Sequence, residues 1–122
     1  MPANPYQKYM EQSISTMSPV QLVVALFDKS EQELKKAIYY IENKQIENAN
    51  KSLTKVQDIV ATLSSSLKMK YEISENLASI YDYLSEQLVK ANIHKDIEII
   101  KELIPFFSEL KESFVQVGKK GY

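Results

Sequence analysis

The stretch IENANKSLTKVQDIVATLSSSL, residues 46–67, predicts the fold of this chain. Its apolar residues recur at alternating intervals of three and four positions, and they are Ile46, Ala49, Leu53, Val56, Val60, Leu63 and Leu67. Because an α-helix completes one turn in about 3.6 residues, this spacing places them along one side of a helix. We therefore predict a helix with a single apolar face toward one neighbour or groove, ending between Lys68 and Tyr71.

The placement of glycine and proline extends this prediction to the whole chain. The sequence contains two Gly and four Pro, and neither residue occurs from Val20 to Ile104. Sheet proteins need many tight turns, which Gly commonly forms because it readily adopts positive φ angles. Long helices joined by short polar loops do not need Gly. The distribution therefore predicts an all-α protein.

A helix is predicted to begin after Ser18, which can cap it, with Pro19 at the first helical position and Gln21 completing a capping box. Its expected core positions are Val20, Val24, Phe27, Glu31, Leu34, Ile38 and Ile41. In its first two turns the apolar surface is wider than this side alone, because Leu22, Val23, Ala25 and Leu26 are apolar too. Such a helix is either central in a bundle or lines a groove for a partner helix or the chain's own N-terminal segment. It is expected to end near Asn43 and Lys44.

Two further helices follow the same pattern. The third is expected from a cap at Ser74 to Asn92, with apolar positions Leu77, Ile80, Tyr81, Leu84, Leu88 and Ala91. The fourth is expected from a cap at Asp96, with apolar positions Ile100, Leu103, Phe107, Leu110, Phe114 and Val117. Pro105 removes the amide that would bond the carbonyl of Lys101, at a cost of about 3 kcal/mol. We expect a kink there rather than a break, because the apolar pattern continues past Pro105.

Short connections make consecutive helices antiparallel, so the predicted fold is an all-α, antiparallel up-down four-helix bundle over residues 18–117. Residues 1–16 form an extended N-terminal segment and residues 118–122 a tail. A length of 122 residues is typical of one domain, so residues 1–122 are predicted to form a single helical-bundle domain.

Composition excludes several classes of protein. The formal net charge is −1 and every basic residue is Lys, so the chain lacks the Arg forks that suit phosphates and base edges, and nucleic acid is not an expected partner. The absence of Cys excludes disulfides and thiol chemistry. The N-terminus does not resemble a signal peptide, and the longest apolar run, from Leu22 to Phe27, is too short to span a membrane. We therefore expect neither secretion through a cleaved signal nor membrane insertion.

The sequence offers little for catalysis. His94 is the only His, it falls in a predicted loop, and Ala91 stands where a di-metal Glu-x-x-His motif needs Glu. The carboxylate pairs Glu31/Glu33 and Glu72/Glu75 are expected to be exposed helix charges. We predict no enzyme activity, no cofactor and no metal. Tyr81 and Tyr83 project in different directions from their helix, so one of them is expected to meet solvent or a ligand.

Several short motifs, in order, resemble a known family. They are Asn4-Pro5-Tyr6 with Tyr9, Ser18-Pro19 with Leu22, Leu26-Phe27-Asp28, Asn76-Leu77, Tyr81-Asp82-Tyr83-Leu84, Leu88 and Ala91-Asn92. Together they resemble the FliS family of flagellar secretion chaperones, over nearly the whole chain. The departures are Lys29 and Ser30, near where the family usually has Gly, and Ser113-Phe114 in place of an Ala-Trp pair. Pro105 is also unexpected.

The resemblance implies a cytoplasmic, non-enzymatic bundle. Such a protein binds the disordered C-terminal segment of flagellin, prevents premature polymerisation, and delivers flagellin to the flagellar type III export apparatus, contacting its export gate while loaded. On this basis the expected partner-binding residues are Tyr6, Tyr9, Leu22, Leu26, Phe27, Asn76, Leu77, Tyr81, Tyr83, Leu88 and Asn92. The family's N-terminal tail can fold back over part of this surface, which would make Tyr6 and Tyr9 a removable cover.

Two questions stay open from the sequence. A helical adaptor or dimerisation bundle that binds a folded partner fits the same composition and periodicity. Whether a regulatory protein competes for the flagellin-binding surface is also left open by the sequence.

Overall fold

The computed structural model describes residues 17–67 and 72–119, which form four α-helices. They are α2 (Pro19–Glu42), α3 (Ile46–Ser65), α4 (Glu72–His94) and α5 (Ile97–Lys119). Packing contacts join α2 to α3, α3 to α4, α4 to α5 and α5 back to α2, which closes the bundle. The predicted all-α four-helix fold is therefore confirmed.

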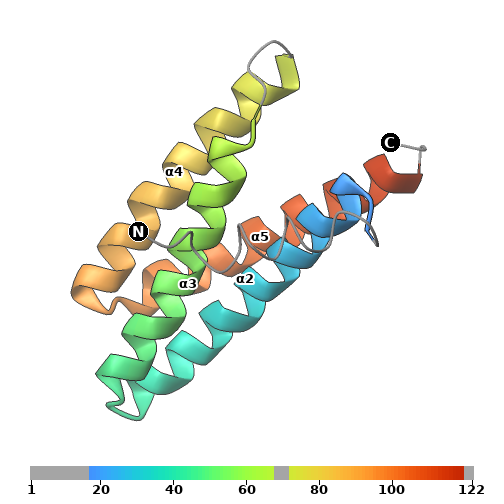
Figure 1. Cartoon of the computed structure of the whole chain (residues 1–122). Coiled ribbons are helices and arrows are strands. Elements are labelled where there is room, and N and C mark those ends of the chain that lie inside the picture. The colour runs from blue at the N-terminus through green and yellow to red at the C-terminus, as the bar shows by residue number, and fades with distance from the viewer. Residues whose placement is uncertain (1–16, 68–71, 120–122) are drawn as a thin grey trace, which may run out of the picture.

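The helices form two pairs, α3 with α4 and α2 with α5, that lie side by side within each pair (Figure 1). The pairs spread apart toward the end where α2 and α4 begin and where α3 and α5 end (Figure 1). This end is called the open end below. Because the pairs diverge rather than stay aligned, the strict antiparallel up-down geometry stays a prediction.

The helix ends follow from local hydrogen bonds. At the start of α2 the Ser18 hydroxyl accepts from the Gln21 amide at 3.1 Å, and the Gln21 side-chain oxygen accepts from the Ser18 amide at 2.9 Å, which confirms the capping box. Asp96 caps α5 as predicted, because its carboxylate accepts from the amides of Glu98 at 3.0 Å and Ile99 at 3.3 Å.

Three predicted boundaries need correction. Helix α3 ends at Ser65, three residues before the predicted range, and α4 begins at Glu72, so Ser74 lies inside the helix instead of capping it. The predicted loop position of His94 is wrong, because His94 is the last, exposed residue of α4. A break at Pro105 is excluded, since α5 runs through it as one helix. The kink stays a prediction.

Four aromatic rings form the centre of the core. The Phe27 ring of α2 packs against Tyr81 of α4 and against Phe107 and Phe114 of α5, with centroids 6.5, 6.3 and 5.5 Å away. The predicted apolar face of α3 is buried at Ala49, Leu53, Val56, Val60 and Leu63. There are two exceptions: Ile46, the first residue of α3, is 48% exposed, and Leu67, beyond the end of α3, is only partly buried.

The buried side of α2 differs from the prediction. Phe27, Glu31 and Leu34 are buried as expected, but Val20, Val24, Ile38 and Ile41 are only partly buried. The positions buried in addition are Leu22, Leu26, Ser30, Glu33 and Ala37. The reason is that α2 packs against both α3 and α5, so it buries a wider sector than one apolar seam.

The pair Glu31/Glu33 was predicted to be exposed, although Glu31 also falls on the predicted core side of α2; the exposure is wrong for both residues. The Glu33 side chain is 0% exposed, with the Nζ atoms of Lys29 at 2.9 Å and Lys36 at 3.2 Å. Glu31 is buried beside Lys111 of α5, whose Nζ lies 3.5 Å from it and 3.1 Å from Asp28. Each buried carboxylate is therefore compensated by the ammonium groups of partly exposed lysines.

Within the described ranges, none of the four helices is both long enough and apolar enough to cross a membrane.

Candidate functional site

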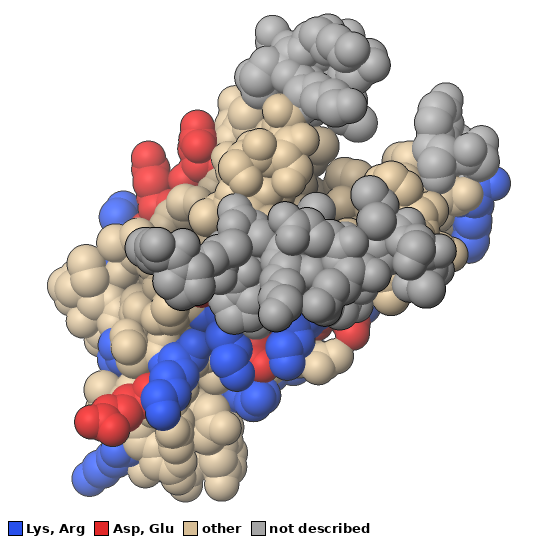
Figure 2. Space-filling model, viewed as in Figure 1, with Lys and Arg blue, Asp and Glu red and all other residues tan. Residues whose placement is uncertain are grey.

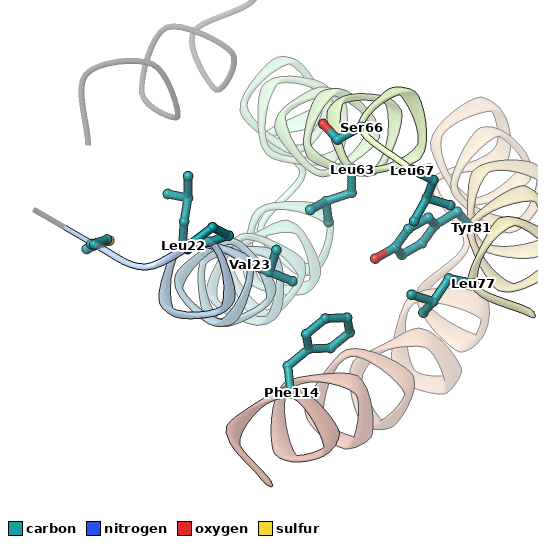
Figure 3. A pocket seen from close by; sticks show the side chains of 10 residues that line it. Leu22, Val23, Leu63, Ser66, Leu67, Leu77, Tyr81 and Phe114 are labelled. Atoms are coloured by element: carbon teal, nitrogen blue, oxygen red, sulfur yellow. The ribbon is translucent and has the colours of Figure 1, made fainter. Parts of the chain in front are cut away.

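A pocket of about 390 Å³ opens between the four helices at the open end of the bundle (Figure 3). Its walls combine the start of α2, the end of α3, the first half of α4 and the end of α5. The lining residues are Met17, Pro19, Leu22, Val23, Leu63, Ser66, Leu67, Leu77, Tyr81 and Phe114. This set, called the open-end pocket below, contains no charged side chain. It suits an apolar occupant.

The pocket exists because the apolar faces of the helices continue past the point where the helices separate. Leu63 and Leu67 extend the buried face of α3, and Leu77 begins that of α4. In Figure 3 these side chains and Phe114 point toward a common centre. Leu67, Leu77 and Phe114 are only partly buried, so apolar surface that a tighter bundle would cover stays accessible here. Uncharged residues also dominate the surfaces on both sides of the hollow (Figure 2).

Tyr81 supplies the deepest polar group of the pocket. Its side chain is 2% exposed, and Figure 3 shows its hydroxyl oxygen pointing into the space between Leu63 and Phe114. Burial raises the pKa of this hydroxyl to about 12, because the phenolate would lose its hydration. Tyr81 is therefore neutral near pH 7 and can donate a hydrogen bond.

The aromatic cluster around Phe27 in the core holds the walls of the pocket in place. Phe27 contacts both Tyr81 and Phe114, so one buried ring of α2 fixes one pocket wall on α4 and another on α5. Leu26 and Phe27 are fully packed in the core and do not line the pocket themselves. Their contribution to the site is to position its walls.

A second hollow lies beside the first, between α2 and α5. Its volume is about 330 Å³, and Phe114 lines both hollows. The helices approach closely there because residue 118 is Gly: a Cβ atom at Gly118 would lie 3.3 Å from the Val20 side chain. The two hollows together offer an elongated surface of the kind that an extended or helical segment occupies.

The buried charged side chains of α2 lie in the middle of this helix, away from the open-end pocket. Burial alone would raise the pKa of the Glu33 carboxyl, but hydrogen bonds from Lys29 and Lys36 outweigh burial and hold it below its usual value. In the part of the chain that the structure describes, no group of three or more acidic or His side chains is placed to hold a metal ion.

Three of the predicted partner-binding residues meet in the open-end pocket: Leu22, Leu77 and Tyr81. Leu88 lies in the core with Leu26 and Phe27. Tyr83 is 42% exposed and packs on Phe106 of α5, with ring centroids 5.4 Å apart, so Tyr81 and Tyr83 do project in different directions.

The asparagines lie elsewhere. Asn76 is exposed near the start of α4. Asn92 bridges to α3, since its side-chain amide donates to Gln57 at 3.0 Å and its oxygen accepts from Lys95 at 2.8 Å. Tyr6 and Tyr9 lie outside the described residues.

Several pocket residues were not predicted as binding residues: Met17, Pro19, Val23, Leu63, Ser66, Leu67 and Phe114. A sequence signal did exist for two of them. Leu67 continues the apolar seam of α3 beyond the end of that helix, and Phe114 lies near the end of the seam of α5. Apolar residues at the ends of several seams indicate exposed apolar surface if the helices separate there.

The comparisons with known proteins agree on one family. The family model described as "Flagellar protein FliS" matches residues 2–121. The chain is 30% identical over 113 residues to the flagellar secretion chaperone FliS of Bacillus subtilis (strain 168), an alignment that covers 93% of this chain and 85% of that protein. It is 29% identical over 117 residues to the flagellar secretion chaperone FliS of Salmonella typhimurium, covering 93% and 87%.

Proposed function

This chain belongs to the FliS family, and on that premise we propose that it is a cytoplasmic export chaperone for flagellin. Its substrate is the C-terminal segment of flagellin, which is disordered in the monomer and helical in the filament. Binding this segment blocks premature polymerisation. The loaded complex then delivers flagellin to the export gate of the flagellar type III apparatus.

The observation that carries this proposal is the uncharged pocket at the open end of the bundle. Its apolar walls come from all four helices, and Phe114 continues them toward the second hollow between α2 and α5. A disordered amphipathic segment can place successive apolar turns on such a surface and become helical as it binds. A catalytic role is not proposed.

Regulation of this surface is part of the proposal. Tyr6 and Tyr9 precede Met17, which lines the open-end pocket, so a segment that covers the pocket is directly continuous with it in sequence. A regulatory protein that binds the same apolar walls would compete with flagellin. Release at the export gate then requires only that the segment leaves this surface.

Binding is tested by titrating a synthetic flagellin C-terminal peptide into the full chain. Calorimetry should show binding with a negative heat-capacity change, because apolar surface is buried. Circular dichroism should show more helix in the mixture than the sum of the separate spectra. Affinity should depend only weakly on salt, since none of the described residues that line the pocket carries a charge.

Leu77→Ser is the matched test of the surface, because Leu77 lines the pocket and is only partly buried. It should weaken peptide binding while the protein stays folded. Val89→Ser on the outer side of α4 is the control, since Val89 is 44% exposed and outside the pocket. Absence of peptide binding by the folded wild type, together with self-association or a folded partner, would replace the chaperone by the adaptor or dimerisation bundle.

A further inference from the structure

Two exposed aromatic rings meet on the outside of the bundle, where α4 packs against α5. Tyr83 of α4 is 42% exposed and Phe106 of α5 is 38% exposed, and their ring centroids lie 5.4 Å apart. Neither residue lines the open-end pocket or the second hollow. Single exposed apolar side chains are common on protein surfaces, but two rings in contact across two helices form a contiguous apolar patch.

The patch continues along both helices. Ile80 stands three residues before Tyr83 on α4, and Leu110 stands four residues after Phe106 on α5. These intervals place each of them on the same helix face as its ring. Both are partly buried against the core. The four residues together are called the α4–α5 strip below.

Three exposed carboxylates stand one helical turn from the two rings. Glu102 and Glu109 are four residues before and three residues after Phe106, and Glu86 is three residues after Tyr83. Each carboxylate therefore shares a helix face with a ring. In the part of the chain that the structure describes, none of the three forms an ion pair. The α4–α5 strip is thus apolar in its middle and negatively charged at its rim.

Several lysines gather on another side of the bundle. Lys29, Lys36 and Lys55 converge on one buried carboxylate where α2 packs against α3. Figure 2 shows lysines over these two helices and acidic side chains along the edge of the molecule that α4 forms. On α4 itself, Lys90 stands seven residues, about two turns, after Tyr83. A chain with a formal net charge of −1 therefore has a locally negative surface around the exposed rings.

We propose that the α4–α5 strip binds an amphipathic helix with a basic rim, supplied by a partner protein other than flagellin. Apolar side chains of this helix, three or four positions apart, pack on Tyr83 and Phe106. Its Lys or Arg side chains pair with Glu86, Glu102 and Glu109 at the edge of the contact.

The charge of the rim selects this partner over the alternatives. An acidic helix would bring like charges against the three carboxylates, which is unfavourable. A helix without charges would remove water from these carboxylates and supply no counter-charge. The strip is also separate from the open-end pocket. A chain that holds flagellin in that pocket can therefore bind the second partner at the same time, which goes beyond the proposed function and does not rest on it.

The test titrates the full chain into a synthetic amphipathic helical peptide built of Leu, Lys and a single Trp. The chain contains no Trp, so the emission of the peptide reports binding. A matched peptide carries Glu in place of every Lys and should bind at least about 10-fold more weakly, because of like-charge repulsion. Affinity for the basic peptide should fall as the salt concentration rises, since salt screens the exposed rim charges.

Two double variants test the two parts of the surface. Tyr83→Ser with Phe106→Ser removes both rings and should weaken binding of the basic peptide by about 10-fold or more, because central aromatic anchors carry much of the energy of an interface. Glu102→Lys with Glu109→Lys keeps both rings and should weaken binding about 10-fold while reducing its salt dependence. Both glutamates are exposed, so this second variant tests the proposal even if the first does not fold.

Two controls address other surfaces. Tyr39→Ser alters a second exposed aromatic pair, since Tyr39 packs on Tyr40 with ring centroids 5.8 Å apart. The exposed side chains one turn before Tyr39 are Lys35 and Lys36, so this pair repels a basic helix and the variant should bind as the wild type does. Leu77→Ser in the open-end pocket should also leave binding of the basic peptide unchanged.

The proposal is overturned if the wild type does not bind the basic peptide, or binds the acidic peptide equally well. Wild-type affinity in both double variants, once they are shown to be folded, would overturn it too. Loss of binding in Leu77→Ser would place the peptide in the open-end pocket instead. If sedimentation shows a dimeric wild type and a monomeric variant without the two rings, a second copy of the chain covers the strip and the basic partner is excluded.

Discussion

Phe27 links the core of the bundle to its candidate binding site, and its replacement by Leu gives the sharpest stability prediction. The ring is fully buried and contacts Tyr81, Phe107 and Phe114. Phe27→Leu keeps an apolar side chain at this position but removes all three ring contacts. Two of the lost contacts also support walls of the open-end pocket.

The magnitude follows from two terms. Truncating a buried Phe to Ala costs about 3–5 kcal/mol, and Leu retains part of that burial. Each aromatic pair contributes about 0.5–1.5 kcal/mol beyond its buried area. We therefore expect Phe27→Leu to lower the free energy of unfolding by about 2–4 kcal/mol. For a chain of this size the melting temperature should fall by roughly 3–5 °C for each kcal/mol lost.

Urea unfolding followed by circular dichroism measures this loss, provided that the m-value stays unchanged. Tyr39→Leu is the matched control: Tyr39 is 57% exposed and pairs with Tyr40 on the surface of α2, with centroids 5.8 Å apart. It should change the free energy of unfolding by less than about 0.5 kcal/mol. Equal losses in the two variants would refute the argument that the buried cluster holds the helices together.

Three further perturbations are informative. Glu33→Gln should lower the free energy of unfolding at neutral pH; because the folded pKa lies below 4.5, the difference from the wild type should vanish as acid titration protonates Glu33. The pKa of Tyr81 is about 12 in the folded chain and 10.0 for an unperturbed side chain. The stability that its neutral form contributes is therefore complete below pH 10 and is lost between pH 10 and 12, where the unfolded chain ionises first. Tyr81→Phe should reduce the alkaline slope by up to about 1.4 kcal/mol per pH unit, measured by urea unfolding. Leu53→Ala should cost about 2–5 kcal/mol by thermal melting, because Leu53 is fully buried.

Local signals in the sequence were sufficient to predict much of the fold. The caps at Ser18 and Asp96 depend on side chains next to the helix they start, so their chemistry is visible in a few residues. The apolar seam of α3 depends only on periodicity. The two tight connections contain no Gly, and Lys44 and Lys95 adopt positive φ angles of 60° and 50° there instead.

The burial of Glu33 was not predictable from periodicity, because it depends on two helices at once. Its position on α2 resembles that of an exposed charge, and only the packing of α3 on that side removes it from solvent. Lys29 and Lys36 lie on the same helix and make this burial tolerable. Four- and three-residue spacings between opposite charges are equally typical of exposed helix faces.

The candidate site was predictable at three of its lining residues but not as a cavity. Leu22, Leu77 and Tyr81 were expected to bind a partner, whereas Leu63 and Leu67 were assigned to a packed seam. Whether a seam is covered or opens into a pocket depends on the angle at which helix pairs separate. Tertiary packing sets that angle, and no short motif encodes it.

The most direct measurement of flagellin binding at the open-end pocket uses a fluorescent probe in its wall. The chain contains no Trp, so Phe114→Trp introduces a single reporter at a partly buried position that lines the pocket. With the variant shown to be folded, saturating flagellin C-terminal peptide should shift its emission to shorter wavelength and protect it from iodide quenching. A Tyr39→Trp control outside the pocket should not respond. Unchanged emission and quenching of Phe114→Trp, while calorimetry shows that the peptide binds, would contradict binding at this site.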